Sequence, residues 1–261
     1  MAVDKEQLAE KPRDFVGAVV HVMNVLRSFD AEHPKMTLSE VSKRTGLDRA
    51  GARRYLLSLA HLGYVVQEDK VFRLSPKVLE LGYAFMATIP LSKMAQQFLD
   101  QITQETGETS AVAILDGQYV VHIARTNSSR MLAPVVTIGR RFPALSTSTG
   151  RVLVAFLPPE ELKTYLKEMG VTAINEWNKL HNMQLEEELE KIRKRGYATV
   201  DQEVEDGVRS IAVPILDASG KPAAAMNILT TVASLPKKKL IDEILPALQQ
   251  SAAELQRSLI T

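Results

Sequence analysis

Two short helical patterns lie almost end to end within residues 37–62, and their spacing constrains the fold of this segment more than any other feature does. Thr37 is followed three residues later by Glu40, as in a capping box, and Gly46 can end the first helix. Asp48 can cap the second. The two helices are therefore separated by very few residues.

The segment after these helices has β-type patterning. The stretch "YVVQEDKVFRLS" contains two β-type runs around the polar "QEDK", which predicts a small hairpin. Upstream, residues 14–29 place apolar side chains at helical spacing, with Asp14 available as an N-cap. A helix pair followed by a hairpin is the pattern of a winged helix-turn-helix, which we assign to residues 1–75.

The last helix of this segment has two chemically different sides. Leu56 and Leu59 lie on a stripe whose spacing predicts burial. Arg49 and Arg53 lie on the other side, with Arg54 beside them. Residues 35–64 hold six basic side chains against two acidic ones, whereas residues 76–261 hold 20 against 21. Basic charge is therefore concentrated in one small segment.

A basic helix face is often no more than a solvated surface, and that alternative stays open for the three arginines. In a helix-turn-helix, however, the N-terminal half of the second helix faces the DNA major groove, where arginine can donate two hydrogen bonds to guanine. We expect Arg49 and Arg53 to contact bases or phosphates and Arg54 to contact phosphate. Weaker candidates for DNA contact are Thr37, Ser39, Lys43, Lys70 and Arg73.

The pattern changes beyond Ser75. Helical patterns around Pro76 and Pro90 indicate linker helices over 76–106, and residues 107–261 form a further domain. There the β-rich stretches "TSAVAIL", "YVVHIAR" and "LAPVVTI" precede three helical patterns, a hairpin in "SIAVPILDASGKPAAAMNIL" and a last helix. Strands at both ends with helices between them predict an α+β domain with one antiparallel sheet.

Several classes of protein are disfavoured by composition. The apolar runs are far shorter than the roughly 20 residues of a membrane-spanning helix, and the charged N-terminus lacks the apolar core of a secretory signal. With no cysteine, the chain has neither disulfides nor cysteine-ligated zinc. We expect a cytoplasmic protein that does not bind membranes. We find no phosphate loop, zinc-spaced histidines or catalytic triad, and expect neither enzymatic activity nor a cofactor or metal.

A cluster of hydroxyl side chains opens an apolar helical pattern in "LSTSTGRVLVAF". Serine and threonine are preferred at helix starts for capping alone, but one cap needs fewer of them. Hydroxyls and backbone N–H groups at a helix N-terminus can also converge on a carboxylate. The candidate residues are Ser146, Thr147, Ser148, Thr149 and Gly150.

The acidic stretch "VDQEVEDGVRSIAVP" is the second candidate segment. Its four acids are not accompanied by paired histidines, so we expect a loop rather than a metal site. Arg125 or Arg141 could balance the charge of an acidic ligand, although either could equally lie on the surface or in an interface. We interpret His122 as a packed strand residue rather than a ligand-binding one.

Four separated motifs resemble the IclR family of bacterial transcriptional regulators over essentially the whole chain. They are "TLSEVSKRTGLDRAGARRYLLSLAHLGYV", "FRLSPKVLELG", "RRFPALSTSTGRVLVA" and "GYATVDQEVEDGVRSIAVPILD". The resemblance implies a winged helix-turn-helix that binds operator DNA and a GAF-like domain that binds a small effector. The first motif looks most like the branch that controls catabolism of protocatechuate, 4-hydroxybenzoate and related aromatic acids.

The family pattern also implies that Asp201 and Ser210 border the effector and that Asn227 supplies a polar group from the opposite wall. We therefore expect a regulator of a catabolic operon that senses a small carboxylate, aromatic or derived from ring cleavage. We expect it to act as a homodimer or dimer of dimers through its first helix and its linker helices. The alternatives are a sensor that acts through a protein partner and, more remotely, an enzyme acting on an aromatic acid.

Overall fold

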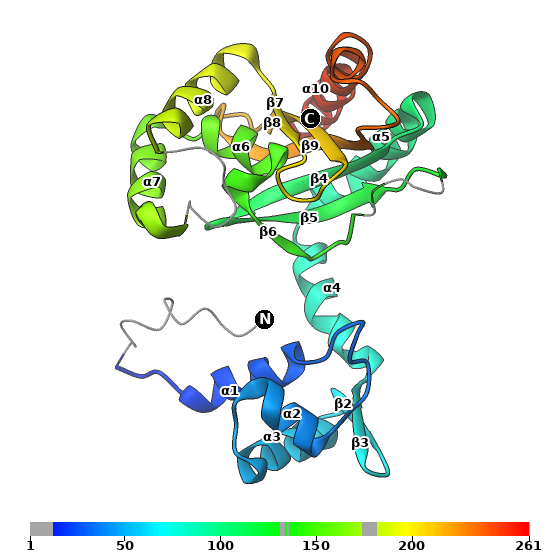
Figure 1. Ribbon diagram of the computed structural model, residues 1–261, viewed down its shortest axis with the longest axis vertical. Helices are drawn as coiled ribbons and strands as arrows, with labels where there is room; N and C mark the ends of the chain where they lie inside the picture. The colour runs from blue at the N-terminus through cyan, green and yellow to red at the C-terminus, as the bar shows by residue number, and fades with distance from the viewer. Residues whose placement is uncertain (1–12, 131–133, 135, 174–181, 261) are drawn as a thin grey trace. The chain divides into compact units, whose positions relative to one another are not determined.

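The computed structural model describes residues 13–130, 134, 136–173 and 182–260 (Figure 1). The chain divides into two compact units, Met1–Phe85 and Met86–Thr261. Within the described residues, no helix is both long enough and apolar enough to cross a membrane.

The first unit is a helix-turn-helix with a small sheet. Its helices are α1 (Gly17–Arg27), α2 (Leu38–Thr45) and α3 (Arg49–His61). Its strands are β1 (Met36–Thr37), β2 (Val65–Glu68) and β3 (Val71–Leu74), in the order β1-β3-β2. The β2–β3 hairpin is the wing that the sequence predicts.

Local capping sets the ends of α2 and α3 as the sequence predicts. The Thr37 hydroxyl accepts a hydrogen bond from the Glu40 backbone N–H, and the Glu40 carboxylate accepts one from the Thr37 backbone N–H at 2.6 Å. Gly46 ends α2 at φ 71°, and Asp48 accepts from the Gly51 N–H at 2.6 Å. The cap expected at Asp14 is wrong, because α1 begins only at Gly17 and has no side-chain cap.

One apolar cluster holds the first unit together. It joins α1, α2, α3 and the sheet through Val25, Phe29, Met36, Val41, Leu56, Leu59, Val65 and Phe72. Because Leu56 is fully buried and Leu59 nearly so, the side of α3 that carries them is fixed against the rest of the unit.

The second unit contains a six-stranded antiparallel sheet in the order β6-β5-β4-β9-β8-β7. The strands are β4 (Thr109–Asp116), β5 (Tyr119–Thr126), β6 (Arg141–Pro143), β7 (Ala198–Asp201), β8 (Val208–Leu216) and β9 (Pro222–Thr231). This confirms the α+β class and the antiparallel sheet. Of "LAPVVTI", residues 134 and 136–138 do not form a strand, and the remainder lies outside the described residues. The Val136 carbonyl accepts a hydrogen bond from the Arg125 guanidinium rather than from a neighbouring strand.

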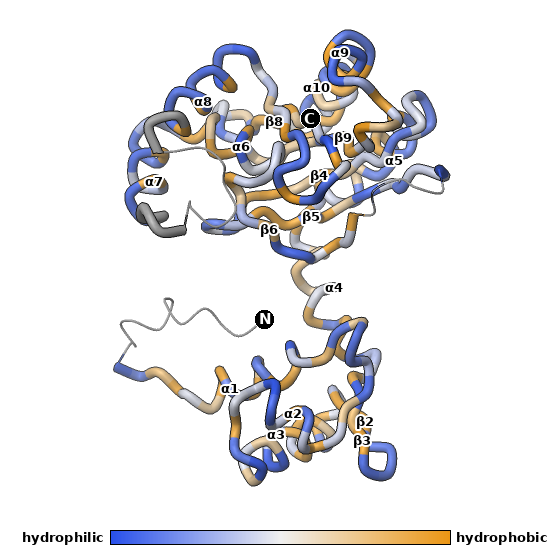
Figure 2. Tube along the Cα trace, viewed as in Figure 1, coloured by the Kyte–Doolittle hydropathy of each residue, from blue (hydrophilic) through white to orange (hydrophobic). Residues whose placement is uncertain are grey.

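Helices cover both faces of this sheet (Figure 1). One face packs against α5 (Pro90–Thr106) and α10 (Leu245–Ile260), and the other against α6 (Ser148–Ala155) and α8 (Asn182–Arg195). We call the second the α6 face. Figure 2 shows apolar residues along β4 and β5 and many hydrophilic residues on α8 and on α7 (Pro159–Ala173).

Helix α5, which the sequence predicts as part of a linker, contributes to the core of the second unit. Leu91, Ala95, Leu99 and Ile102 recur at helical spacing and are buried in the apolar cluster beneath α10. The shorter α4 (Leu79–Ala87) has no buried residue, and the boundary between the two units falls within it.

Candidate functional site

The exposed side of α3 presents guanidinium groups that have no partner in the described part of the chain. Arg49 and Arg53 are exposed and make neither a hydrogen bond nor an ion pair with any described residue. Arg54 is also exposed, and its guanidinium lies 5.6 Å from the centre of the Tyr55 ring. The buried leucines on the other side of α3 hold these groups on a rigid support.

Arg44 provides an instructive contrast, because its side chain is fully engaged within the unit. One nitrogen is 2.6 Å from an Asp30 carboxylate oxygen, and another donates to the Ser28 carbonyl at 3.1 Å. Arg44 therefore links α2 to the end of α1, whereas Arg49 and Arg53 are available to an external partner.

The weaker candidates on α2 and the wing differ from one another. Ser39 and Lys43 on α2 and Lys70 in the wing turn are exposed. The Thr37 hydroxyl is committed to Glu40 as a helix cap. Arg73 donates to Glu68 at 2.8 Å.

Glu68, the last residue of β2 before the wing turn, is a shared partner of two basic side chains. Hydrogen bonds from Lys35, at 2.9 Å, and from Arg73 lower the pKa of its carboxyl group. Of the two basic wing candidates, Lys70 is thus the freer to contact an anion.

Three of the predicted effector-binding residues, Arg125, Ser210 and Asn227, lie on the α6 face of the second unit. The pairing of Arg125 with Ala111, and of Ala111 with Asn227, places the three in one row across β5, β4 and β9. Ala212 of β8 continues this row, because it pairs with Asn227. Directly opposite residues of paired strands lie on the same face of a sheet. The row therefore presents a guanidinium and an amide separated by a methyl group.

Asn227 is only 3% exposed, and its Oδ1 atom has no hydrogen-bond partner among the described residues. Arg125 donates to the carbonyl of Val136 and to the Asn127 side chain. Ser210 pairs with Val200 and Leu229 and lies two residues before Ala212, so it belongs to the same face.

The hydroxyl groups at the start of α6 differ in what they contact: some form hydrogen bonds within the helix start, and one has no partner among the described residues. Thr147 is the N-cap, accepting from the Gly150 N–H at 3.0 Å, and Thr149 donates to the Thr147 hydroxyl at 3.2 Å. Ser146 is buried. Ser148 is 1% exposed, and its hydroxyl has no partner within the described ranges. Buried polar atoms usually find a partner, so Ser148 is the member of this cluster best suited to bind a ligand.

Gly150 has a role in packing. A Cβ atom built on it would lie 2.0 Å from the Ala144 carbonyl oxygen, too close for any side chain. Glycine therefore lets α6 approach the segment before it.

Two predicted residues lie elsewhere. Asp201 pairs with Arg209 across β7 and β8, on the face opposite to Ser210, and its carboxylate is 2.9 Å from the Arg209 guanidinium. Arg141 forms an ion pair with Asp116 at 2.8 Å and lies over the Tyr119 ring. The structure does not bring Asp201 together with the row of Arg125 and Asn227.

Two polar residues of the α6 side are not among the predicted effector-binding residues: His122, which we interpreted from the sequence as a packed strand residue, and Arg151. His122 pairs with Ala113, which places it on the α6 face, and neither ring nitrogen has a partner among the described residues. Arg151, 3% exposed, forms a two-point ion pair with Glu203 in the loop between β7 and β8. Strict alternation along β5 would have placed His122 and Arg125 on opposite faces. The sequence pattern therefore did not predict that the two residues share one face.

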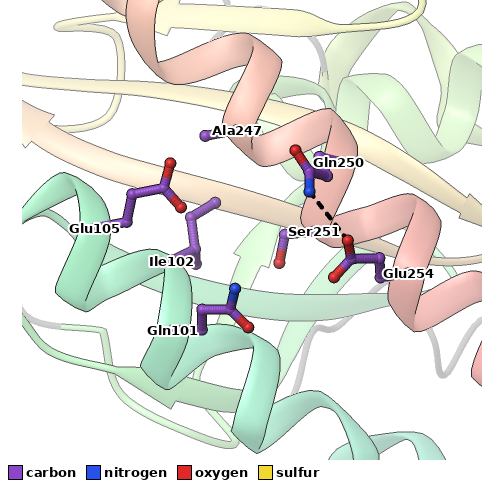
Figure 3. A pocket seen from close by; sticks show the side chains of 7 residues that line it. All are labelled: Gln101, Ile102, Glu105, Ala247, Gln250, Ser251 and Glu254. Carbon is purple, nitrogen blue, oxygen red and sulfur yellow. Dashed lines mark hydrogen bonds between the residues drawn. The ribbon is translucent and has the colours of Figure 1, made fainter.

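Two hollows elsewhere on the second unit do not suit an organic anion. One lies between α5 and α10 and has a volume of only about 20 Å³, enough for a water molecule (Figure 3). The other is open and has three glutamates in its lining, which would repel a carboxylate; they are Glu160, Glu161 and Glu168. Within the described ranges, acidic and histidine side chains do not gather in threes that could hold a metal ion.

The structure combines a winged helix-turn-helix, whose Arg49 and Arg53 have no partner among the described residues, with a separate domain whose buried polar atoms include several that are likewise unpartnered there. These are the features of a DNA-binding regulator with an effector-binding domain. Models of the IclR helix-turn-helix domain and of the bacterial transcriptional regulator IclR C-terminal domain match residues 18–69 and 83–257. The chain belongs to the IclR family, which confirms the resemblance. It is a family of transcriptional regulators rather than enzymes.

Individual relatives agree with this assignment. The chain is 35% identical to the Pca regulon regulatory protein of Pseudomonas putida over 93% of this chain and 84% of that protein. A transcriptional regulator from Rhodococcus sp. RHA1 is 39% identical and superposes with a TM-score of 0.81, covering 94% of this chain and 98% of that one.

A third relative was solved with a ligand. It is a double mutant of the inducer-binding domain of the PobR transcription factor from Acinetobacter, in complex with 3-hydroxybenzoic acid. This domain is 32% identical and covers 63% of the present chain and 96% of its own, with a TM-score of 0.57.

Proposed function

We propose that this protein regulates a catabolic operon in response to a small aromatic carboxylate. Arg49 and Arg53 of α3 contact operator DNA, and the α6 face of the second unit binds the effector. The observation that carries the DNA-contact assignment is a contrast: Arg44 is engaged within the unit, whereas Arg49 and Arg53 are exposed and have no partner among the described residues.

The effector assignment is supported by polar atoms of the α6 face and of α6 itself. Arg125 supplies positive charge, while Asn227 and Ser148 supply buried polar atoms that lack partners among the described residues. A carboxylate can accept a charge-assisted hydrogen bond from the Arg125 guanidinium and a hydrogen bond from the Ser148 hydroxyl, whereas the Asn227 Oδ1 atom is itself an acceptor and needs a donor on the ligand. The hydroxybenzoic acid held by the PobR inducer-binding domain supports an aromatic acid as the ligand class.

The protein binds DNA as a homodimer or dimer of dimers in this proposal, since one small domain makes few base contacts. Apolar side chains left exposed in the first unit provide surfaces for association. They are Phe15, Val16, Val19 and Met23 at α1, and Leu79, Leu81, Tyr83 and Phe85 on α4.

A thermal-shift screen with benzoate, its hydroxylated derivatives and short aliphatic carboxylates tests the ligand class, because a ligand that binds only the folded state raises the unfolding temperature. Arg125→Ala should weaken carboxylate binding by about tenfold or more, whereas Lys163→Ala, which removes an exposed charge on α7, should not. Equal binding by the Arg125 variant and the wild type would refute this assignment.

A further inference from the structure

His122 is a buried histidine whose polar atoms the proposed carboxylate site leaves unused. Its side chain is 5% exposed, and neither Nδ1 nor Nε2 has a hydrogen-bond partner among the described residues. Burial lowers the pKa of His122 to about 4. At neutral pH the ring is therefore uncharged and offers one donor and one acceptor. It cannot supply charge to a carboxylate, but it can bind a neutral hydroxyl group.

An aromatic ring on β6 and an alanine on β4 lie beside His122. The Phe142 ring on β6 meets the imidazole edge to face, with centroids 6.0 Å apart at 79°. The Arg140 guanidinium lies 4.8 Å from the centre of the same Phe142 ring. The row that runs from His122 across β4 and β9 continues with Ala113 and Ala225.

The register of β4 relates His122 to the proposed carboxylate-binding groups. Ala111 lies in the row of Arg125 and Asn227, and Ala113 lies in the row of His122. Two residues along a strand correspond to about 7 Å. The α6 face thus has a guanidinium and an amide in one row, an uncharged imidazole in the next, and alanine methyl groups within both rows. A ligand with a flat apolar ring and a polar group at each end would fit these two rows.

We propose that His122 is a specificity-determining residue of the effector site, which binds the ring hydroxyl of a hydroxylated aromatic acid. This inference rests on the proposed function, because it requires the carboxylate to lie near Arg125 and Asn227. A phenolic hydroxyl is neutral at pH 7 and can both donate and accept hydrogen bonds, which makes it complementary to the neutral imidazole. An unsubstituted aromatic acid leaves the buried imidazole without a partner and binds less tightly.

Isothermal titration of the full-length protein with benzoate, 3-hydroxybenzoate and 4-hydroxybenzoate tests this inference. The wild type should bind one of the hydroxybenzoates at least about tenfold more tightly than benzoate. In His122→Phe this preference should fall to within about threefold, because the ligand hydroxyl loses its hydrogen-bond partner. His61→Gln, which alters an exposed histidine at the end of α3, should keep the wild-type preference.

A second measurement uses only the wild-type protein, so it does not depend on whether the His122 variant folds. In the ¹⁵N spectrum of wild-type protein, the hydroxybenzoate should shift the imidazole signals of the buried neutral histidine, and benzoate should shift them far less. If the wild type binds the carboxylates without preferring a hydroxyl group, or if His122→Phe keeps the preference, the role of His122 is overturned. The proposed function would still stand in either case. If none of the three acids binds the wild type, the proposed function fails and this inference fails with it.

Discussion

Arg125 and His122 are three residues apart on β5, yet both lie on the α6 face of the sheet. Val112 pairs with Ala124 and Ala113 pairs with His122, so Ile123 is an extra residue without a partner on β4. Such a β-bulge interrupts the alternation of side chains between the two faces. The bulge thereby places a cationic group and a neutral hydrogen-bonding group on the same side.

Removing the Ser148 hydroxyl should lower the affinity for the effector without lowering the stability of the protein. Because its oxygen is buried without a partner among the described residues, Ser148→Ala should change the free energy of unfolding by less than about 0.5 kcal/mol or increase it slightly. The affinity for the carboxylate effector should fall about fivefold or more, since one hydrogen bond is lost.

Thr147→Ala is the matched control for that variant. It removes the N-cap of α6 and should cost about 1 kcal/mol of stability. Chemical denaturation and effector titration on both variants give the comparison. A Ser148→Ala protein with wild-type effector affinity would exclude the hydroxyl from the site.

Gly150→Ala should destabilise the second unit. The added methyl group would collide with the Ala144 carbonyl, a backbone atom that cannot rotate away, and we expect a loss of about 1 to 3 kcal/mol. Gly82→Ala on α4 meets nothing within 4 Å and should be neutral or up to about 1 kcal/mol stabilising. If urea denaturation shows equal stability for the two variants, the close approach of α6 is not a constraint.

The buried imidazole makes stability depend on pH. The unfolded chain protonates His122 near its ordinary pKa of 6.5, whereas the folded chain does so only near 4. The unfolded state therefore binds more protons between these values, and the contribution is complete above about pH 6.5 and is lost as the pH falls toward 4.

Between pH 7 and pH 5, the wild type should consequently lose about 2 kcal/mol more unfolding free energy than His122→Phe does. His61→Gln should follow the wild type. Denaturation curves at the two pH values provide the test. Equal losses of unfolding free energy in the wild type and His122→Phe would show that the histidine is not held neutral.

Much of the fold follows from local signals in the sequence. The caps at Thr37 and Asp48, the wing and the β8–β9 hairpin depend on residues close together in the chain, where hydrogen-bonding chemistry decides the structure. The burial of α5 depends instead on distant partners on α10 and the sheet, which its own pattern does not identify.

The candidate effector site was less accessible to sequence reasoning for a similar reason. Ser148 and Thr147 are neighbours of the same type, yet one is unpartnered within the described residues and the other caps the helix. Only the cross-strand register shows that Asn227 shares a row with Arg125 and that Asp201 lies on the opposite face. Register depends on long-range pairing, which spacing along the chain does not determine.

In the proposed function, α3 binds operator DNA through the exposed guanidinium groups of Arg49 and Arg53. The decisive measurement is the salt dependence of binding to an operator duplex that the purified protein selects from a random pool, compared for wild type, Arg53→Ala and Lys163→Ala. Arg53→Ala should lose about 1 to 3 kcal/mol of affinity, with a salt slope lower by about 1 if the contact is to phosphate, while Lys163→Ala binds as the wild type does. Unchanged operator affinity and an unchanged salt slope in Arg53→Ala would contradict this assignment.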